Sequence, residues 1–192
     1  MGKYVGNKPS AEYLDWIPLH NVAANVDSEI TFTDLNSDFD EYKFEFVGIH
    51  PSADNSNITF QANAVGATGF NETITSTFTG GHHKEDAAAT SAPYYETGFD
   101  QAQATGYNIQ ATYLGNAANE SGSGFMYLFA PSSTTFVKHF FGLINLNTSN
   151  EYVRFNDGAG MINITAAIDQ ISFKMSSGTI DAGTITMFGL AK

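Results

Sequence analysis

The sequence predicts an all-β protein, an antiparallel β-sandwich of jelly-roll type with an extended N-terminal arm. Short runs in which apolar and polar residues alternate recur through most of the 192 residues, and this period of two is typical of half-buried strands. The composition also favours strands and turns, since the chain holds 16 Phe, 9 Tyr and 18 Gly. Turn-forming clusters separate the runs at the spacing expected of sandwiches and barrels.

Residues 1–27 are predicted to form the arm, because Pro9 and Pro18 interrupt any regular pattern there. The apolar anchors along this arm are Tyr4, Tyr13, Trp16 and Ile17. An arm with such anchors docks on its own domain or on a neighbouring molecule, and the sequence leaves both open.

Residues 28–192 are predicted to form the sandwich domain. In the clearest run, Tyr42, Phe44 and Phe46 share one face of a strand, while Lys43 and Glu45 share the other. The other runs in the first half of the domain are "EITFTD", "NITFQANA" and "ETITSTFT".

A long loop insertion is predicted at about residues 80–105, where the alternation stops. Long loops of surface proteins often carry their binding residues. Tyr94 and Tyr95 are therefore candidates to stack on sugars. The alternative, which we favour, is that they cover the edge of a neighbouring core.

Strands resume in the second half of the domain, for a total of ten to twelve. The run "GFMYLFAP" is apolar on both faces, which predicts a central strand covered by a layer on each side. Gly142 indicates a bulge or a bend in the next strand, and "NDGAG" at residues 156–160 indicates a turn. The last strand, which ends "TITMFGL", is predicted to be buried on both faces.

Charge excludes several partners. The net charge is −12 and Arg154 is the only arginine, so the basic patch that nucleic acid requires is missing. The acidity instead suits an abundant surface protein that must stay soluble.

No apolar stretch approaches the ~20 residues of a membrane-spanning helix, so no membrane insertion is expected. The chain has no cysteine, which excludes disulfides, cysteine metal sites and thiol nucleophiles.

An acidic stretch offers a candidate metal site, for calcium. The alternating oxygen-bearing residues resemble the ligands of a calcium loop, with a glutamate at the twelfth position. The candidate ligands are Asp34, Asn36, Asp38, Asp40 and Glu45. Phe39 occupies the position where that loop needs glycine, and a strand follows instead of a helix. The favoured interpretation is an acidic turn between two strands, without a cofactor.

No catalytic constellation stands out. The stretch "ESGSGF" lacks the G-x-S-x-G spacing of a nucleophile elbow. No pair of carboxylates is distinguished from the others as a glycosidase dyad. The sequence therefore predicts a protein that is not an enzyme, and a small glycan-cleaving enzyme ranks last among its functions.

Three segments carry a resemblance to a known group of proteins. They are "YVGNKPSAEYLDWIPL" near the start, "FTDLNSDFDEYKFEFVGIHPS", and "ISFKMSSGTIDAGTITMFGLAK" at the end. Each resembles segments of uncharacterised virion structural proteins of tailed bacteriophages. In the last segment the matching residues are Gly178, Ile180, Gly183, Met187, Phe188, Gly189 and Leu190.

The resemblance implies a non-enzymatic protein on the virion surface, made in the cytoplasm of the bacterial host. Such modules trimerise, so the expected partners are further copies of the chain and either the major capsid protein or tail proteins. A capsid decoration (cement) protein is favoured, because the chain is short and lacks the repetitive shaft of a fibre. The alternative is a tail-fibre or receptor-binding module that binds host surface glycan.

Overall fold

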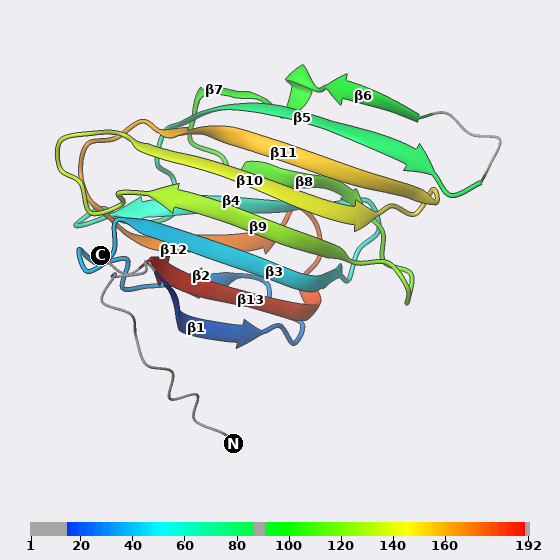
Figure 1. The fold of residues 1–192 in the computed structure, drawn as a ribbon, viewed down its shortest axis with the longest axis horizontal. Helices are drawn as coiled ribbons and strands as arrows, with labels where there is room; N and C mark the ends of the chain where they lie inside the picture. The colour runs from blue at the N-terminus through cyan, green and yellow to red at the C-terminus, as the bar shows by residue number, and fades with distance from the viewer. Residues whose placement is uncertain (1–14, 87–90, 191–192) are drawn as a thin grey trace, which may run out of the picture.

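The computed structural model describes residues 15–86 and 91–190, so the predicted anchors Tyr4 and Tyr13 lie outside the described residues. The described chain forms thirteen strands and one 3-10 turn, more strands than we expected (Figure 1). The elements are β1 (Trp16–Ala23), β2 (Ile30–Phe32), β3 (Glu41–Pro51), β4 (Ser56–Ala64), β5 (Ile74–Lys84), β6 (Ser91–Tyr95), η1 (Thr97–Phe99), β7 (Gln101–Ala104), β8 (Asn108–Leu114), β9 (Gly122–Phe129), β10 (Lys138–Asn147), β11 (Tyr152–Ile162), β12 (Ile168–Met175) and β13 (Ile180–Leu190).

The strands form two sheets, in which all the named strand pairs are antiparallel. The large sheet has the order β1-β13-β3-β9-β10-β11-β5-β6, with β7 also paired to β5, and the small sheet has the order β2-β12-β4-β8. Figure 1 shows the small sheet stacked behind the large one. The predicted β-sandwich is therefore confirmed, whereas its jelly-roll connectivity stays a prediction.

Aromatic side chains join the two sheets. Phe173 of the small sheet lies with its ring centre 5.1 Å from that of Phe44 and 5.2 Å from that of Phe46. Phe60 meets Phe140 in an edge-to-face contact at 4.8 Å, the geometry that aromatic pairs prefer. Each ring buried in this way stabilises the fold by roughly 2–3 kcal/mol. The predicted inward face of residues 42–46 is thus confirmed as core.

Part of the predicted arm is a strand. Residues 16–23 form β1, which pairs with β13 at the edge of the large sheet. The pairing shifts between Pro18 and His20, as expected where proline lacks the N–H that a ladder needs. Trp16 lies 5.6 Å from the ring centre of Tyr127, and Ile17 is exposed. In this part, the arm docks on its own domain.

Two glycine-based predictions are wrong. β10 pairs with both neighbours without a shift in register, so Gly142 marks no bulge. Residues 156–160 lie inside β11 and form no turn. At Gly142 a Cβ atom would lie 2.8 Å from the side-chain oxygen of Gln110, so the missing side chain makes room for the small sheet.

The predicted loop at 80–105 is mostly regular structure. β5 continues to Lys84, and β6, η1 and β7 then run back along its edge. Gly80 and Gly81 lie inside β5 and do not break it. The side chains of Tyr94 and Phe155 occupy the space that a Cβ atom at these positions would need. The prediction was wrong because these glycines serve close packing.

The last strand is core on one face only. Ile185 and Met187 are buried, whereas Phe188 and Leu190 on the other face are partly exposed. The prediction that β13 is buried on both faces is therefore wrong. The Lys43 ammonium lies 4.4 Å from the ring centre of Phe188 and covers part of it.

Candidate functional site

The most prominent surface feature is the outer face, which we define as the outward side chains of β9, β10 and β11. β9 lies in the middle of the large sheet, as predicted. Its outward residues Phe125, Tyr127 and Phe129 are only partly buried, and no strand of the described residues covers them (Figure 1). The predicted second layer is therefore wrong for the described part of the chain.

Aromatic rings form a continuous cluster on the outer face. The ring centre of Tyr127 lies 5.2 Å from that of Phe125 and 5.0 Å from that of Phe141. Phe141 also stacks with Phe129 at 5.8 Å. Trp16 extends the cluster from the sheet edge, through its contact with Tyr127. The cluster thus spans the sheet from β1 to β10.

The outer face is apolar, exposed and almost free of charge. Phe141 is 40% exposed, Leu143 38%, Val153 41% and Phe155 46%. Asp157 is the single Asp, Glu, Lys or Arg among the outward residues of these three strands. Contiguous apolar patches of this kind are typical of surfaces that contact a protein, a membrane or a ligand.

A polar rim borders the outer face along β3. Glu41 and Glu45 alternate there with Lys43, whose ammonium lies 5.4 Å from the ring centre of Trp16. Burial raises the pKa of the Glu41 carboxyl above its usual value. An apolar centre with a polar rim is the usual anatomy of a protein–protein interface.

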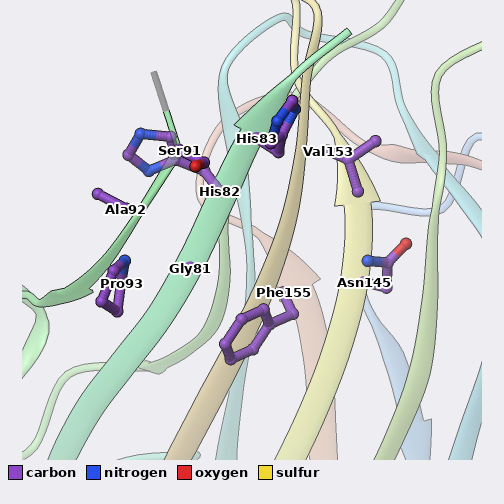
Figure 2. A pocket seen from close by; sticks show the side chains of 9 residues that line it. All are labelled: Gly81, His82, His83, Ser91, Ala92, Pro93, Asn145, Val153 and Phe155. Atoms are coloured by element: carbon purple, nitrogen blue, oxygen red, sulfur yellow. The ribbon is translucent and has the colours of Figure 1, made fainter. Parts of the chain in front are cut away.

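The Phe155 hollow is a depression of about 420 Å³ near one end of the outer face (Figure 2). Its lining residues are Gly81, His82, His83, Ser91, Ala92, Pro93, Asn145, Val153 and Phe155. The Phe155 ring lies against the backbone of Gly81, where a Cβ atom would be 2.5 Å from the ring. An aromatic wall beside histidine, serine and amide groups can both stack on a flat ligand and hydrogen-bond to it.

The Gly160 groove is a second depression, of about 550 Å³. Its lining residues are Thr75, Ser76, Thr77, Phe129, His139, Phe140, Phe141, Ala159, Gly160 and Met161. Ala159 and Gly160 bring almost no side-chain bulk, while Phe129 and Phe141 supply aromatic walls. The groove therefore suits an apolar side chain from a partner.

The two candidate tyrosines lie on opposite faces of β6. Tyr94 faces inward, where the Asn156 side-chain amide donates to its hydroxyl at 2.7 Å. Burial is the main cause that raises the pKa of Tyr94, and the nearby Arg154 partly offsets it. Tyr94 therefore covers a core edge, the interpretation favoured from the sequence. Tyr95 faces outward, is 59% exposed, and donates to Asp100 at 2.6 Å.

The five candidate calcium ligands are not gathered in one place. Asp34 and Asn36 line a small hollow of about 260 Å³ together with Asp169. The Asn36 side-chain oxygen accepts from the backbone N–H of Asp38 at 2.8 Å. Glu45 lies in β3, ~13 Å along the strand from its first residue.

Asp40 is exposed at the end of the same acidic turn. Across residues 15–86 and 91–190, no group of three or more His, Asp or Glu side chains could hold a metal ion. Calcium binding by this turn stays a prediction.

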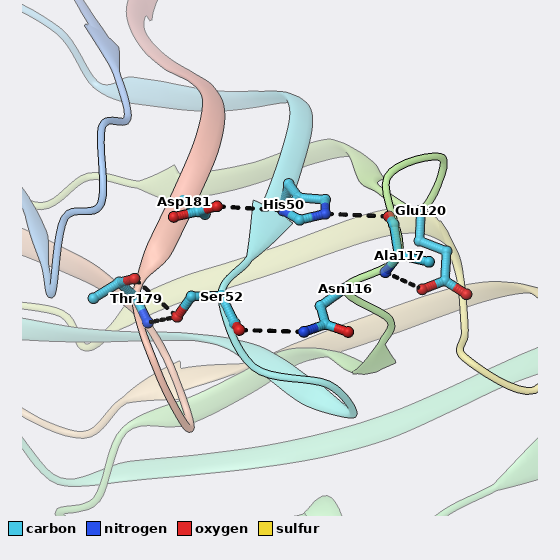
Figure 3. Close-up of polar contacts among 7 residues, drawn as sticks. All are labelled: His50, Ser52, Asn116, Ala117, Glu120, Thr179 and Asp181. Atoms are coloured by element: carbon cyan, nitrogen blue, oxygen red, sulfur yellow. Dashed lines mark hydrogen bonds and ion pairs between the residues drawn. The ribbon is translucent and has the colours of Figure 1, made fainter.

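His50, Asp181 and Ser52 lie near one another beside the 116–120 turn (Figure 3). His50 Nδ1 lies 4.0 Å from Asp181, and its Nε2 lies 3.2 Å from the carbonyl oxygen of Ala117. The Ser52 hydroxyl oxygen instead accepts from the backbone N–H of Thr179 at 2.8 Å. A nucleophilic triad needs histidine Nε2 at the serine hydroxyl, so these contacts fasten β3 to β13 and to the 116–120 turn.

No family model, curated protein or solved structure matches the chain. In the part of the chain that the structure describes, no helix is long and apolar enough to cross a lipid bilayer. The outer face is thus the feature on which a functional proposal can be built.

Proposed function

We propose that this chain is a non-enzymatic structural protein on the surface of a bacteriophage virion, held among its neighbours by the outer face. The observation that carries the proposal is the exposed aromatic cluster around Tyr127 and Phe141, on strands almost free of charge. Burial of such a surface is worth roughly 25 cal/mol per Å². A protein with a net charge of −12 can use it for contact without bringing acidic groups together.

The phage setting is supported by the resemblance of the chain to virion structural proteins. A capsid decoration protein is the favoured role, with the jelly-roll connectivity and homotrimeric assembly that the resemblance implies. The major capsid protein is then the principal partner. A position in the tail is the alternative, and the chain would there contact tail proteins.

Gold-labelled antibody against the protein, applied to purified phage particles, tests this proposal in the electron microscope. Gold spread over the heads is expected for a decoration protein. Gold confined to the tail would indicate a tail-fibre protein instead. If intact particles carry no gold and a denaturing gel finds no trace of the protein in them, the virion proposal is wrong.

A receptor-binding module that holds host glycan is the second candidate, and the Phe155 hollow favours it. Phe155 can stack on a sugar ring, while His83 and Asn145 can hydrogen-bond to hydroxyls. A glycan array is the test. Binding that is lost in Phe155→Ser but kept in Val47→Ser, an exposed apolar residue outside the hollow, would support this candidate.

A further inference from the structure

We propose that the partner on the outer face is a second copy of this chain, which inserts Phe136 into the Gly160 groove. The inference rests on the proposed function and deepens it, because it names the partner of the outer face. Phe136 is 72% exposed, the highest value among the exposed large apolar residues of the described chain. The Gly160 groove, of about 550 Å³ and with aromatic walls, has room for such a phenyl ring.

The backbone of Phe136 is anchored by two hydrogen bonds. Its backbone N–H donates to the Ser133 hydroxyl at 3.0 Å, and its carbonyl oxygen accepts from the Lys138 ammonium at 3.2 Å. Lys138 is itself fully buried. A backbone anchored in this way loses little conformational freedom on docking, which leaves more of the apolar burial of the side chain as affinity.

Phe136 and the groove lie at the same end of the large sheet. Phe136 precedes His139 by three residues, and His139 lines the groove. A two-fold axis beside this end can therefore place each Phe136 over the groove of the other copy. Such reciprocal contact is the rule in symmetric dimers, and a closed ring of three copies can use the same contact head to tail.

Size and charge favour a second copy. Together with the neighbouring strands β3 and β5, the outer face spans five strands. At a spacing of ~4.8 Å, with ten residues of ~3.3 Å rise each, these five strands give a face of about 800 Å². This is the area that each partner buries in a standard interface, ~800 Å². Two copies that each carry a net charge of −12 can meet most favourably where charge is missing, and the outward residues of β9, β10 and β11 hold only Asp157.

Sedimentation velocity of the full chain tests the inference. The wild type is expected to form a species at a multiple of 20.7 kDa, and Phe136→Ser to weaken self-association by at least about tenfold. Ala159→Phe, which fills the groove, should have the same effect. Val65→Ser changes an apolar residue that is 59% exposed and lies outside the groove, and it should leave self-association unchanged. Near-UV circular dichroism verifies that each variant is folded.

Two outcomes overturn the inference: a wild type that stays monomeric at all concentrations, or a folded Phe136→Ser variant that associates as strongly as the wild type. The proposed function is judged separately by gold labelling of particles. A monomer that still labels particles leaves the proposed function standing with another partner on the outer face. If the chain forms an oligomer that depends on Phe136 but is missing from particles, the inference is supported and the proposed place on the virion is wrong.

Discussion

The ammonium nitrogen of Lys138 lies 2.6 Å from the backbone carbonyl oxygen of Ala166, in the interior of the protein. It also donates to the carbonyl oxygens of Phe136, Ile164 and Thr165, at 3.2, 3.1 and 2.9 Å. Burial lowers the pKa of Lys138, although the nearby Glu72 partly offsets this. One buried cation thus ties the turn before β12 to the loop that presents Phe136.

We expect Lys138→Met to destabilise the protein by about 3 kcal/mol, because buried carbonyl oxygens lose their donor. Urea unfolding measures this change. Lys84→Met is the matched control, since Lys84 pairs with Asp86 at the surface and exposed pairs of this kind contribute little to stability. Equal losses in the two variants would show that the buried cage of carbonyls has no special role.

The ionisation of Tyr42 should make the folded protein less stable at alkaline pH. Its hydroxyl donates to the Asn36 carbonyl at 3.1 Å, and burial raises the pKa of Tyr42 from 10.0 to about 12. Between these values the unfolded chain has released the proton and the folded chain has not. Stability therefore falls as pH rises from 10.0 to about 12, by about 2–3 kcal/mol in total.

Urea unfolding of Tyr42→Phe at several alkaline pH values measures this contribution. The variant loses one hydrogen bond, worth about 1 kcal/mol at neutral pH, but its stability should fall less steeply above pH 10.0. Tyr95→Phe, at a tyrosine that is 59% exposed, is the control for the loss of a tyrosine hydroxyl. Parallel slopes for wild type and Tyr42→Phe would contradict the prediction.

The strands could be predicted because alternation reports the burial of one face directly. Tyr42, Phe44 and Phe46 read as one buried face, and they are. Glycine misled the prediction, because it serves two purposes that look alike in sequence. Gly142 and Gly80 leave room for the side chains of Gln110 and Tyr94, but those partners come from other strands, and a single sequence does not show which strands meet.

The sequence contains the signal of the outer face, but we interpreted that signal differently. Residues 124–131 read as apolar on both faces, which is correct, and we expected both faces to be covered within the domain. The second cover is not among the described strands, so the same signal now indicates a contact surface. The exposure of Phe136 was not predictable, because it depends on the loop that Ser133 and Lys138 fix.

Gly183 lies inside β13, where the pairing with β3 shifts in register, and Gly183→Ala should destabilise the protein by about 3 kcal/mol. Its φ is +106°, and a Cβ atom would lie 2.5 Å from the carbonyl oxygen of Gly48. Strain in this backbone region alone costs about 1–2 kcal/mol, and the clash adds to it.

Gly66→Ala separates the two effects, because Gly66 has a φ of +80° with nothing within 4 Å of an added Cβ atom. It should cost about 1 kcal/mol, from backbone strain alone. Thermal unfolding of both variants gives the comparison. If the two variants lose the same stability, the close approach of β13 to Gly48 contributes nothing.

Trp16 is the only tryptophan in the chain and reports on the outer face. Its ring contacts Tyr127 at 5.6 Å and is partly exposed, so a partner that covers this side of the sheet removes water from it. We expect its fluorescence emission to move to shorter wavelength as protein concentration rises. The shift should be lost in Phe136→Ser and kept in Val65→Ser. Constant emission in a wild type that does associate would mean that the second copy leaves the β1 side of the outer face uncovered, and the contact would then be restricted to β10, β11 and β5 around the Gly160 groove.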